Sequence, residues 1–307
     1  MDKYKVYDIC IEVINKLSNG IISSYICPIC GNLFDRNSIQ SKRLTAEDVP
    51  PKSIGGRQMI LTCKRCNNDL GSKLDSQIKN YQNFIKSVKT ISTGKGHLTH
   101  KVKYQVNGYE ANAICKMNNS KININFQKKI NNPINITRIN EFLESQTKSE
   151  NNGFEFNISP NSRFHIRYFD IALLKNAYLI IFAKLGYTYI FHENYKIIRN
   201  QIINYDKKIL KNFVIRLNND YNGFNLFISK SPFKAILVQI NNALVVLPTI
   251  TSKNDLYAEL SKYIEKKINF ESDPLIWPKE IELENDYFVL KYLKNDEAIL
   301  KLKAEAS

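Results

Sequence analysis

Two Cys-x-x-Cys pairs constrain the N-terminal part of this chain more than any other feature of its sequence. The pairs are CPIC at residues 27–30 and CKRC at residues 63–66, with 32 residues between them. Each short turn points two sulfurs at one place, so two such turns complete a tetrahedral shell of four thiolates around zinc. Glycine follows the first pair and asparagine follows the second, as tight turns require. We therefore expect a structural zinc site made of Cys27, Cys30, Cys63 and Cys66.

A shell of four thiolates leaves no open position for water, so this ion would hold a small domain together rather than catalyse. The alternative is that the two pairs are unrelated redox or accidental pairs. The remaining Cys10 and Cys115 have no partner by spacing, and we expect both to be small buried residues.

Length, apolar patterning and charge set the broad class of the protein. The 307 residues suggest two domains or more, and 43% hydrophobic with 24% charged residues is an ordinary globular composition. No signal peptide is visible, and Lys175 and Lys184 interrupt the most apolar stretch, so we expect a cytoplasmic protein without a membrane span. The net charge of +15 favours a nucleic-acid partner, although a general richness in Asn, Ile and Lys also contributes lysine.

The segment between and after the cysteine pairs predicts two strands followed by a helix. The motif TAEDVPPKSIGG at residues 45–56 precedes an apolar run at 59–62, which predicts a strand. Apolar residues then recur at three- and four-residue steps from Leu74 to Ile85, which indicates a helix. Residues 1–20 have the spacing of an amphipathic helix that packs on this region.

This order of elements and these residues resemble the HNH endonucleases, also called the ββα-metal or His-Me finger family. The resemblance covers roughly residues 25–80 and rests on the pattern T-x-E-H-x-x-P-x-S-x-G-G, then C-x-x-C-N and a glycine. The matching positions are Thr45, Glu47, Pro51, Ser53, Gly55, Gly56, Cys63, Cys66, Asn67 and Gly71. Two positions depart from the pattern. Asp48 stands where the family has its general-base histidine, and Gln58 lies near the family's middle asparagine.

The resemblance implies a metal-dependent endonuclease that hydrolyses DNA phosphodiester bonds. Glu47 matches the acidic ligand and Asn67 the helix-side ligand of one catalytic Mg²⁺ or Mn²⁺ ion, which acts as a Lewis acid on the phosphate. Asp75 is a further carboxylate that could face the ion. RNA stays open as a substrate beside DNA. The family alone suggests a role in anti-phage defence or in a mobile element.

Asp48 decides whether such a site would cut. A carboxylate with a pKa of about 3.9 is a weaker base than histidine, so the substitution should cost about 10²-fold in rate unless burial raises that pKa. Asp48 could still orient water for slow chemistry, or Glu47 and Asp48 could both bind the ion. The finger could also bind nucleic acid without cutting it. A distant histidine is a further alternative, and His97 and His100 lie nearest in sequence.

Basic residues around the two cysteine pairs are the expected contacts to nucleic acid, because Lys and Arg release counterions from phosphates. They are Lys52, Arg57, Lys64, Arg65 and Lys73. Two other functions stay open at this point. One is a nucleic-acid-binding protein with an inactive finger, and the other is a zinc-stabilised interaction module that binds no nucleic acid.

The sequence as a whole predicts an α+β protein with two domains. We expect a zinc-stapled ββα-metal finger domain at residues 1–92 and a mixed α+β substrate or specificity domain at residues 93–307. The second domain contains an Asn-Gly hairpin turn at residues 107–108 and a long helix at 165–187 that leads into a strand. Strands are expected from about 101 to 138, the last of them being INITRI at 134–139, and also at 223–229 and 233–249. The other expected elements are a helix at 254–268 and a strand pair or tail at 286–303.

Overall fold

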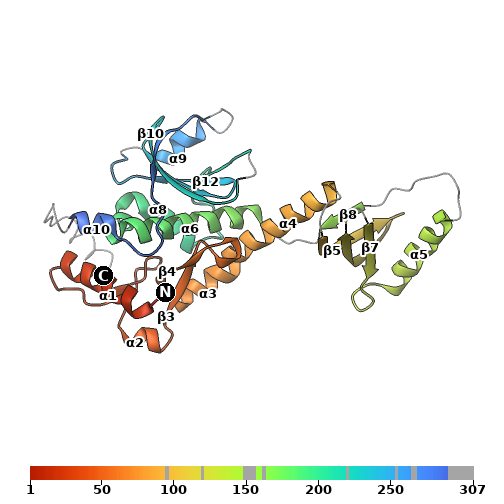
Figure 1. Cartoon of the computed structure of the whole chain (residues 1–307), viewed down its shortest axis with the longest axis horizontal. Coiled ribbons are helices and arrows are strands. Elements are labelled where there is room, and N and C mark those ends of the chain that lie inside the picture. Colours follow the sequence, from red (N-terminus) through yellow and green to blue (C-terminus); the bar gives the residue numbers. More distant parts are fainter. Residues whose placement is uncertain are drawn as a thin grey trace. The chain divides into compact units, whose positions relative to one another are not determined.

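A computed structural model of the chain contains two compact units, each with helices and strands, so the expected mixture of α and β structure is confirmed (Figure 1). It describes residues 1–93, 97–118, 121–147, 157–160, 164–218, 221–252, 255–263 and 268–289. One unit contains Met1–Ile78 together with Ile166–Ser307, and the other contains Lys79–His165. The division differs from the expected one at residue 92, because the residues after 165 belong to the same compact unit as the N-terminal part of the chain.

The N-terminal part of the first unit contains a long helix and two short hairpins. Its elements are α1 (Lys3–Leu17), β1 (Tyr25–Ile26), β2 (Leu33–Phe34), α2 (Asn37–Gln40), β3 (Leu44–Val49), a 3-10 turn (Lys52–Ile54) and β4 (Arg57–Cys63). Asp2 caps α1, and the apolar side of that helix is buried, so the helix expected at residues 1–20 is confirmed. Strands β3 and β4 pair antiparallel and contain a bulge at the Glu47–Asp48 step.

The helix after the second cysteine pair begins earlier than its apolar spacing indicates. It consists of α3 (Lys64–Leu70), a π-helical turn (Gly71–Asp75) and α4 (Ser76–Thr93). Cys63 is its N-cap, where the sulfur accepts a hydrogen bond from the N–H of Cys66 at 3.4 Å. Single π-helical turns within α-helices are frequent at functional sites, and this one carries both Gly71 and Asp75.

Helix α6 (Ile166–Leu185) is the central helix of the first unit and is buried on nearly every side (Figure 1). It packs against β3, against the π-helical turn and against β12 (Ala243–Pro248). The lysines that interrupt its apolar sequence, Lys175 and Lys184, are buried and each lies between two carboxylates. No helix in the described ranges is long and apolar enough to cross a membrane.

The strand expected after α6 is wrong, because residues there form α7 (Tyr187–Ile190) and α8 (Glu193–Ile203). The carboxylate of Asp286, on α10 (Glu284–Phe288), accepts hydrogen bonds from the backbone N–H groups of Tyr187 at 2.6 Å and Thr188 at 2.8 Å. These two groups have no partner within α7, so Asp286 caps it from a distant part of the chain. Local sequence contains no sign of this cap, and an apolar, tyrosine-rich stretch alone resembles a strand.

This buried cap predicts that the free energy of unfolding depends on pH. Burial raises the pKa of Asp286 to about 6 from 3.8, although its hydrogen bonds to Thr188 and Tyr187 oppose the shift. The folded state therefore binds the proton more tightly. A stabilising contribution of about 3 kcal/mol is complete below pH 3.8 and is lost as the pH rises through about 6.

Denaturant unfolding of the wild type and of Asp286→Asn from pH 4 to pH 8 checks this expectation. The difference in the free energy of unfolding between the two proteins should change by up to about 3 kcal/mol across that range, with the wild type losing stability as the pH rises. Parallel pH profiles for the two proteins would contradict the assignment to Asp286.

A five-stranded antiparallel sheet completes the first unit, with strand order β13-β10-β11-β12-β9. Its elements are β9 (Val214–Arg216), β10 (Phe224–Ser231), β11 (Ala235–Ile240), β12, α9 (Leu256–Ser261) and β13 (Glu271–Leu275). The expected strand at 233–249 is a hairpin that turns at Asn241, and because both of its strands are fully buried, no alternation marks that turn. The helix expected at 254–268 is shorter. The strand pair expected at 286–303 is wrong at its start, which lies in α10, and its remainder from residue 290 falls outside the described residues.

Besides the part of α4 from Lys79 onward, the described residues of the second unit form a four-stranded antiparallel sheet of order β7-β6-β5-β8 and a further helix. Its elements are β5 (His97–Val106), β6 (Tyr109–Asn118), β7 (Lys121–Phe126), α5 (Pro133–Thr147) and β8 (Asn157–Pro160). The Asn107–Gly108 turn is confirmed, with φ positive at both residues. The strand expected at 134–139 is wrong. Asn132 accepts a hydrogen bond from the N–H of Ile134, and Pro133 takes the first helical position, so a helix starts there.

Candidate functional site

The four cysteines of the two Cys-x-x-Cys pairs meet in one cluster and could hold a metal ion. The first pair lies in the turn between β1 and β2, and the second lies where β4 passes into α3. Their sulfur atoms all lie within 4.8 Å of one another, and the sulfurs of Cys30 and Cys63 are 3.8 Å apart. Zinc–sulfur bonds of about 2.3 Å in a tetrahedron place sulfurs about 3.8 Å apart. The cluster is therefore compatible with structural zinc, while Cys10 and Cys115 are buried elsewhere.

The turn between β3 and β4 requires the two glycines of the motif. Gly55 has φ of +94°, a left-handed conformation that side chains other than glycine adopt only with strain. A Cβ on Gly56 would lie 1.6 Å from the carbonyl oxygen of Pro50, so no side chain fits there. The turn therefore needs glycine at both positions, because its backbone at Gly56 lies against the carbonyl group of Pro50.

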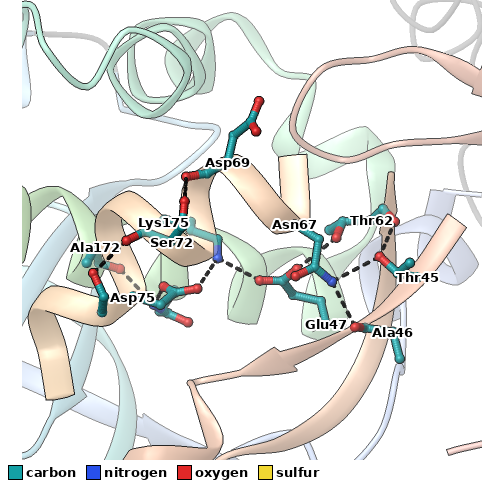
Figure 2. Close-up of polar contacts among 12 residues, drawn as sticks. Thr45, Ala46, Glu47, Thr62, Asn67, Asp69, Ser72, Asp75, Ala172 and Lys175 are labelled. Atoms are coloured by element: carbon teal, nitrogen blue, oxygen red, sulfur yellow. Dashed lines mark hydrogen bonds and ion pairs between the residues drawn. The ribbon is translucent and has the colours of Figure 1, made fainter. Parts of the chain in front are cut away.

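Glu47 on β3 is buried and both of its carboxylate oxygens have partners (Figure 2). One oxygen accepts a hydrogen bond from the Thr62 hydroxyl on β4 at 2.8 Å. The other forms an ion pair with the Lys175 ammonium of α6 at 2.6 Å. Glu47 is only 2% exposed, so the Lys175 charge replaces the water that would otherwise solvate this carboxylate.

Asp75, at the end of the π-helical turn, holds the same ammonium from the other side. One of its carboxylate oxygens lies 2.6 Å from the Lys175 nitrogen (Figure 2). The other accepts a hydrogen bond from the Asn176 amide at 3.1 Å. Burial alone would lower the pKa of Lys175, but the charges of Glu47 and Asp75 outweigh that effect and raise it, so the ammonium stays charged. The result is a buried cluster of one cation and two anions.

Asn67 on α3 is fixed by hydrogen bonds to the residues that precede Glu47 on β3. Its amide nitrogen donates to the carbonyl oxygen of Ala46 at 2.9 Å and to the Thr45 hydroxyl at 3.0 Å. Since the Ala46 carbonyl only accepts, the NH₂ group must face it. Gly71 lies beside the amide oxygen: a Cβ there would be 3.9 Å from the amide oxygen of Asn67 and 3.9 Å from a carboxylate oxygen of Asp75.

Glu47, Asn67 and Asp75 together offer the oxygen ligands that Mg²⁺ and Mn²⁺ prefer. The absent side chain of Gly71 leaves space between the Asn67 and Asp75 oxygens. Carboxylate and amide oxygens of this kind are the ligand types that a hard divalent ion takes. However, the Lys175 ammonium already contacts Glu47 and Asp75, so such an ion and this lysine would draw on the same carboxylates.

Asp48 faces different surroundings from its neighbour Glu47. It lines an open cleft of about 740 Å³ between α1, the β3–β4 turn and residues 279–281. The basic residues of this cleft are Lys5, Lys52, Arg57 and Lys279. Burial and then the charge of Glu47 raise the pKa of Asp48, and Lys52 opposes this. The raised pKa makes Asp48 a better proton acceptor than a solvated aspartate.

The structure does not join Asp48 to the cluster of Glu47, Asn67 and Lys175 by any hydrogen bond or ion pair among the residues it describes. Successive side chains of a strand point to opposite faces, which accounts for the different surroundings of Glu47 and Asp48. Gln58, which pairs with Asp48 across the hairpin, also lines the cleft.

The five basic residues singled out in the sequence do not gather on one surface. Lys52 and Arg57 line the cleft of Asp48. Arg65 and Lys73 line a second pocket of about 380 Å³ beside the cysteine cluster. Lys64 is exposed and lines neither of these two hollows.

Sequence reasoning did not identify Lys175, which is the residue that connects α6 to the candidate site. The signal available was a charged residue within the most apolar stretch of the chain. The side chains of His97 and His100, the alternative bases, lie outside the part that the structure describes. Comparison of this chain with protein-family models, with curated proteins and with solved structures finds no match.

Proposed function

We propose that this protein is a metal-dependent endonuclease of the HNH type that hydrolyses DNA phosphodiester bonds. In this proposal β3, β4 and α3 form the ββα-metal finger, and structural zinc in the cysteine cluster holds it together. The observation that carries the proposal is that Asp48, at the family's general-base position, lies in a cleft lined with basic side chains. The neighbouring Glu47 and Asn67 offer oxygen ligands on the same hairpin and helix.

The charge of the cleft suits a phosphodiester backbone. Four basic side chains from three parts of the chain line it: Lys5, Lys52, Arg57 and Lys279. Asp2 and Glu280 also line it, so its charge is mixed and a bound strand would be positioned rather than simply attracted. The net charge of +15 supports a polyanionic partner, and RNA remains an alternative to DNA.

In the proposed reaction Asp48 and the ligands of the metal ion, Glu47 and Asn67, act on one phosphate. Asp48 accepts a proton from the attacking water, and its raised pKa favours that role. Lys52 and Arg57 hold the phosphate beside it. Glu47 and Asn67 would hold Mg²⁺ or Mn²⁺, and the ion would supply Lewis-acid stabilisation of the phosphate and the leaving oxygen. Hydrogen bonds from Asn67 to Thr45 and Ala46 fix the direction of its amide oxygen.

A second candidate function is nucleic-acid binding by a finger that does not cut. Two observations favour it: Asp48 replaces the histidine, and Lys175 already neutralises Glu47. Such a protein would still bind DNA at low salt through the basic cleft, and its affinity would fall as salt rises.

A plasmid-nicking assay with zinc-loaded protein distinguishes the two functions. We expect cleavage with Mn²⁺ or Mg²⁺, none with EDTA, and a loss of at least about 10²-fold in Asp48→Ala, because a positioned base contributes that much or more. Asp48→His should retain or increase the rate, since histidine titrates near neutral pH. Single-stranded RNA and DNA of matched sequence, assayed in parallel, identify the substrate.

The matched control is Glu12→Ala, which removes an exposed carboxylate of α1 that pairs with Lys16 at the helix surface and should leave the rate unchanged. Binding without cleavage by the wild type, with cleavage appearing only in Asp48→His, would support the second function. Cleavage by the wild type at the same rate in EDTA would contradict the proposed reaction.

A further inference from the structure

Lys175 places a permanent cation inside the proposed metal site. Its side chain is fully buried, and its nitrogen lies 2.6 Å from an oxygen of Glu47 and 2.6 Å from an oxygen of Asp75. An unpaired ammonium in this position would be very unfavourable, so the two carboxylates and the lysine depend on one another. The lysine comes from α6, 128 residues beyond Glu47 in the chain.

The ammonium has the surroundings that a metal ion would have. The carboxylates of Glu47 on β3 and of Asp75 on the π-helical turn contact it directly (Figure 2). Both carboxylates carry a further hydrogen bond, from Thr62 to Glu47 and from Asn176 to Asp75, which keeps their oxygens directed at the lysine.

We infer that Lys175 is a built-in counter-ion that competes with the divalent ion for Glu47 and Asp75 and thereby sets the metal affinity of the site. This inference rests on the proposed function, in which Glu47 is a metal ligand. Lys175 supplies one positive charge between the two carboxyl groups, and without it no fixed cation lies between them. A divalent ion is attracted more strongly to the second arrangement and no longer repelled by a nearby ammonium.

The expected consequence is weak binding of divalent ions by the wild type. Replacing Lys175 by methionine, which fills a similar volume without charge, should strengthen Mn²⁺ binding by at least about tenfold. Replacing Asp75 by asparagine should weaken it by at least about tenfold, because the site loses one anion while Lys175 stays paired with Glu47. The two substitutions thus move the affinity in opposite directions.

The test is a titration of the zinc-loaded full chain with Mn²⁺, without nucleic acid, followed by the paramagnetic resonance signal of free Mn²⁺. The midpoint of thermal unfolding with and without Mn²⁺ is a second readout, and it should rise much more in Lys175→Met than in the wild type. Lys184→Met is the matched control. Lys184 also lies on α6, but it pairs with the partly exposed Glu282 and Glu284 and not with Glu47 or Asp75. Lys184→Met should therefore leave the weak Mn²⁺ binding of the wild type unchanged.

The double variant Lys175→Met with Glu47→Gln assigns the site, since the gain in Mn²⁺ affinity should disappear there. If Lys175→Met does not fold, Lys175→Gln tests the inference instead: its amide can still donate to a carboxylate, but it carries no charge, so Mn²⁺ affinity should again rise. Equal Mn²⁺ affinity in the wild type, Lys175→Met and Asp75→Asn would overturn the competition but leave the nuclease proposal standing. If the wild type does not cleave DNA in the nicking assay while the Mn²⁺ affinities of the variants change as expected, the nuclease proposal alone would be overturned.

Discussion

Replacing Cys63 by serine is expected to remove the bound zinc and to unfold the region around the two cysteine pairs. The Cys63 sulfur accepts a hydrogen bond from the backbone N–H of Cys66 at the start of α3, and it lies 3.8 Å from the Cys30 sulfur. Cys63 therefore takes part in both the cysteine cluster and the helix cap. The strands beside the first pair, β1 and β2, contain two residues each and cannot form a stable hairpin alone. Structural zinc contributes on the order of 10 kcal/mol in small domains, so we expect a loss of more than about 5 kcal/mol.

The effect should extend to α6, because the first cysteine turn is bound to it and to the segment that follows. The Tyr178 hydroxyl donates to the carbonyl oxygen of Pro28 at 2.5 Å, and the Tyr187 hydroxyl donates to that of Ile26 at 2.9 Å. Metal content by mass spectrometry and thermal unfolding measure the result. Purified wild type should contain one zinc per chain, and Cys115→Ala, in the second unit, should retain it. Wild type that contains no zinc and melts unchanged after chelation would contradict the prediction.

Replacing Glu47 by alanine is expected to cost about 3–5 kcal/mol of folding free energy, because it leaves the buried Lys175 with Asp75 as its remaining anion. The variant removes one of the two anions that compensate the buried Lys175 charge, and it takes away the acceptor of the buried Thr62 hydroxyl. Glu47→Gln should cost less, since its amide oxygen can still accept from Lys175. Denaturant unfolding of both variants measures these differences.

An exposed ion pair of the same chemistry is the control for Glu47. Glu12 and Lys16 pair on the surface of α1, with more than half of each side chain exposed, so Glu12→Ala should cost about 1 kcal/mol or less. If Glu47→Ala is as mild as Glu12→Ala, Lys175 must find another partner or reach water. The stability of Glu47→Ala also matters for the nicking assay. A slower DNA cleavage by this variant reflects the missing metal ligand only if the variant is folded.

Local sequence predicted those elements whose stabilising partners are close in the chain. The N-terminal helix, the strand at 59–62 and the Asn107–Gly108 turn follow from periodicity and turn chemistry, and the structure confirms them. The strand expected at 134–139 shows the limit of alternation as a signal. Ile134 and Ile136 are two positions apart, as in a strand, but the cap at Asn132 and the proline after it start a helix instead.

The division into two units could not be predicted from composition. Nothing in the sequence marks the residues after 165 as partners of the first 78, because the contacts that join them are long-range. The same reason applies to α7, whose cap comes from Asp286, and to α6, whose apolar sequence identifies a core helix without saying what surrounds it.

For the candidate site, the sequence by itself determined the residue types and the spacing that chemistry requires: two cysteine pairs, and Glu47, Asp48 and Asn67 around one hairpin. Such spacing fixes local geometry, so the four sulfurs meet in the structure as expected. Only the tertiary structure decided what surrounds these residues. It places Lys175 against Glu47 and Asp75, and it places Asp48 in a cleft of mixed charge that α1 and residues 279–281 help to line. The physical reason is that charge, burial and pKa depend on neighbours in space, which come from distant segments of the chain.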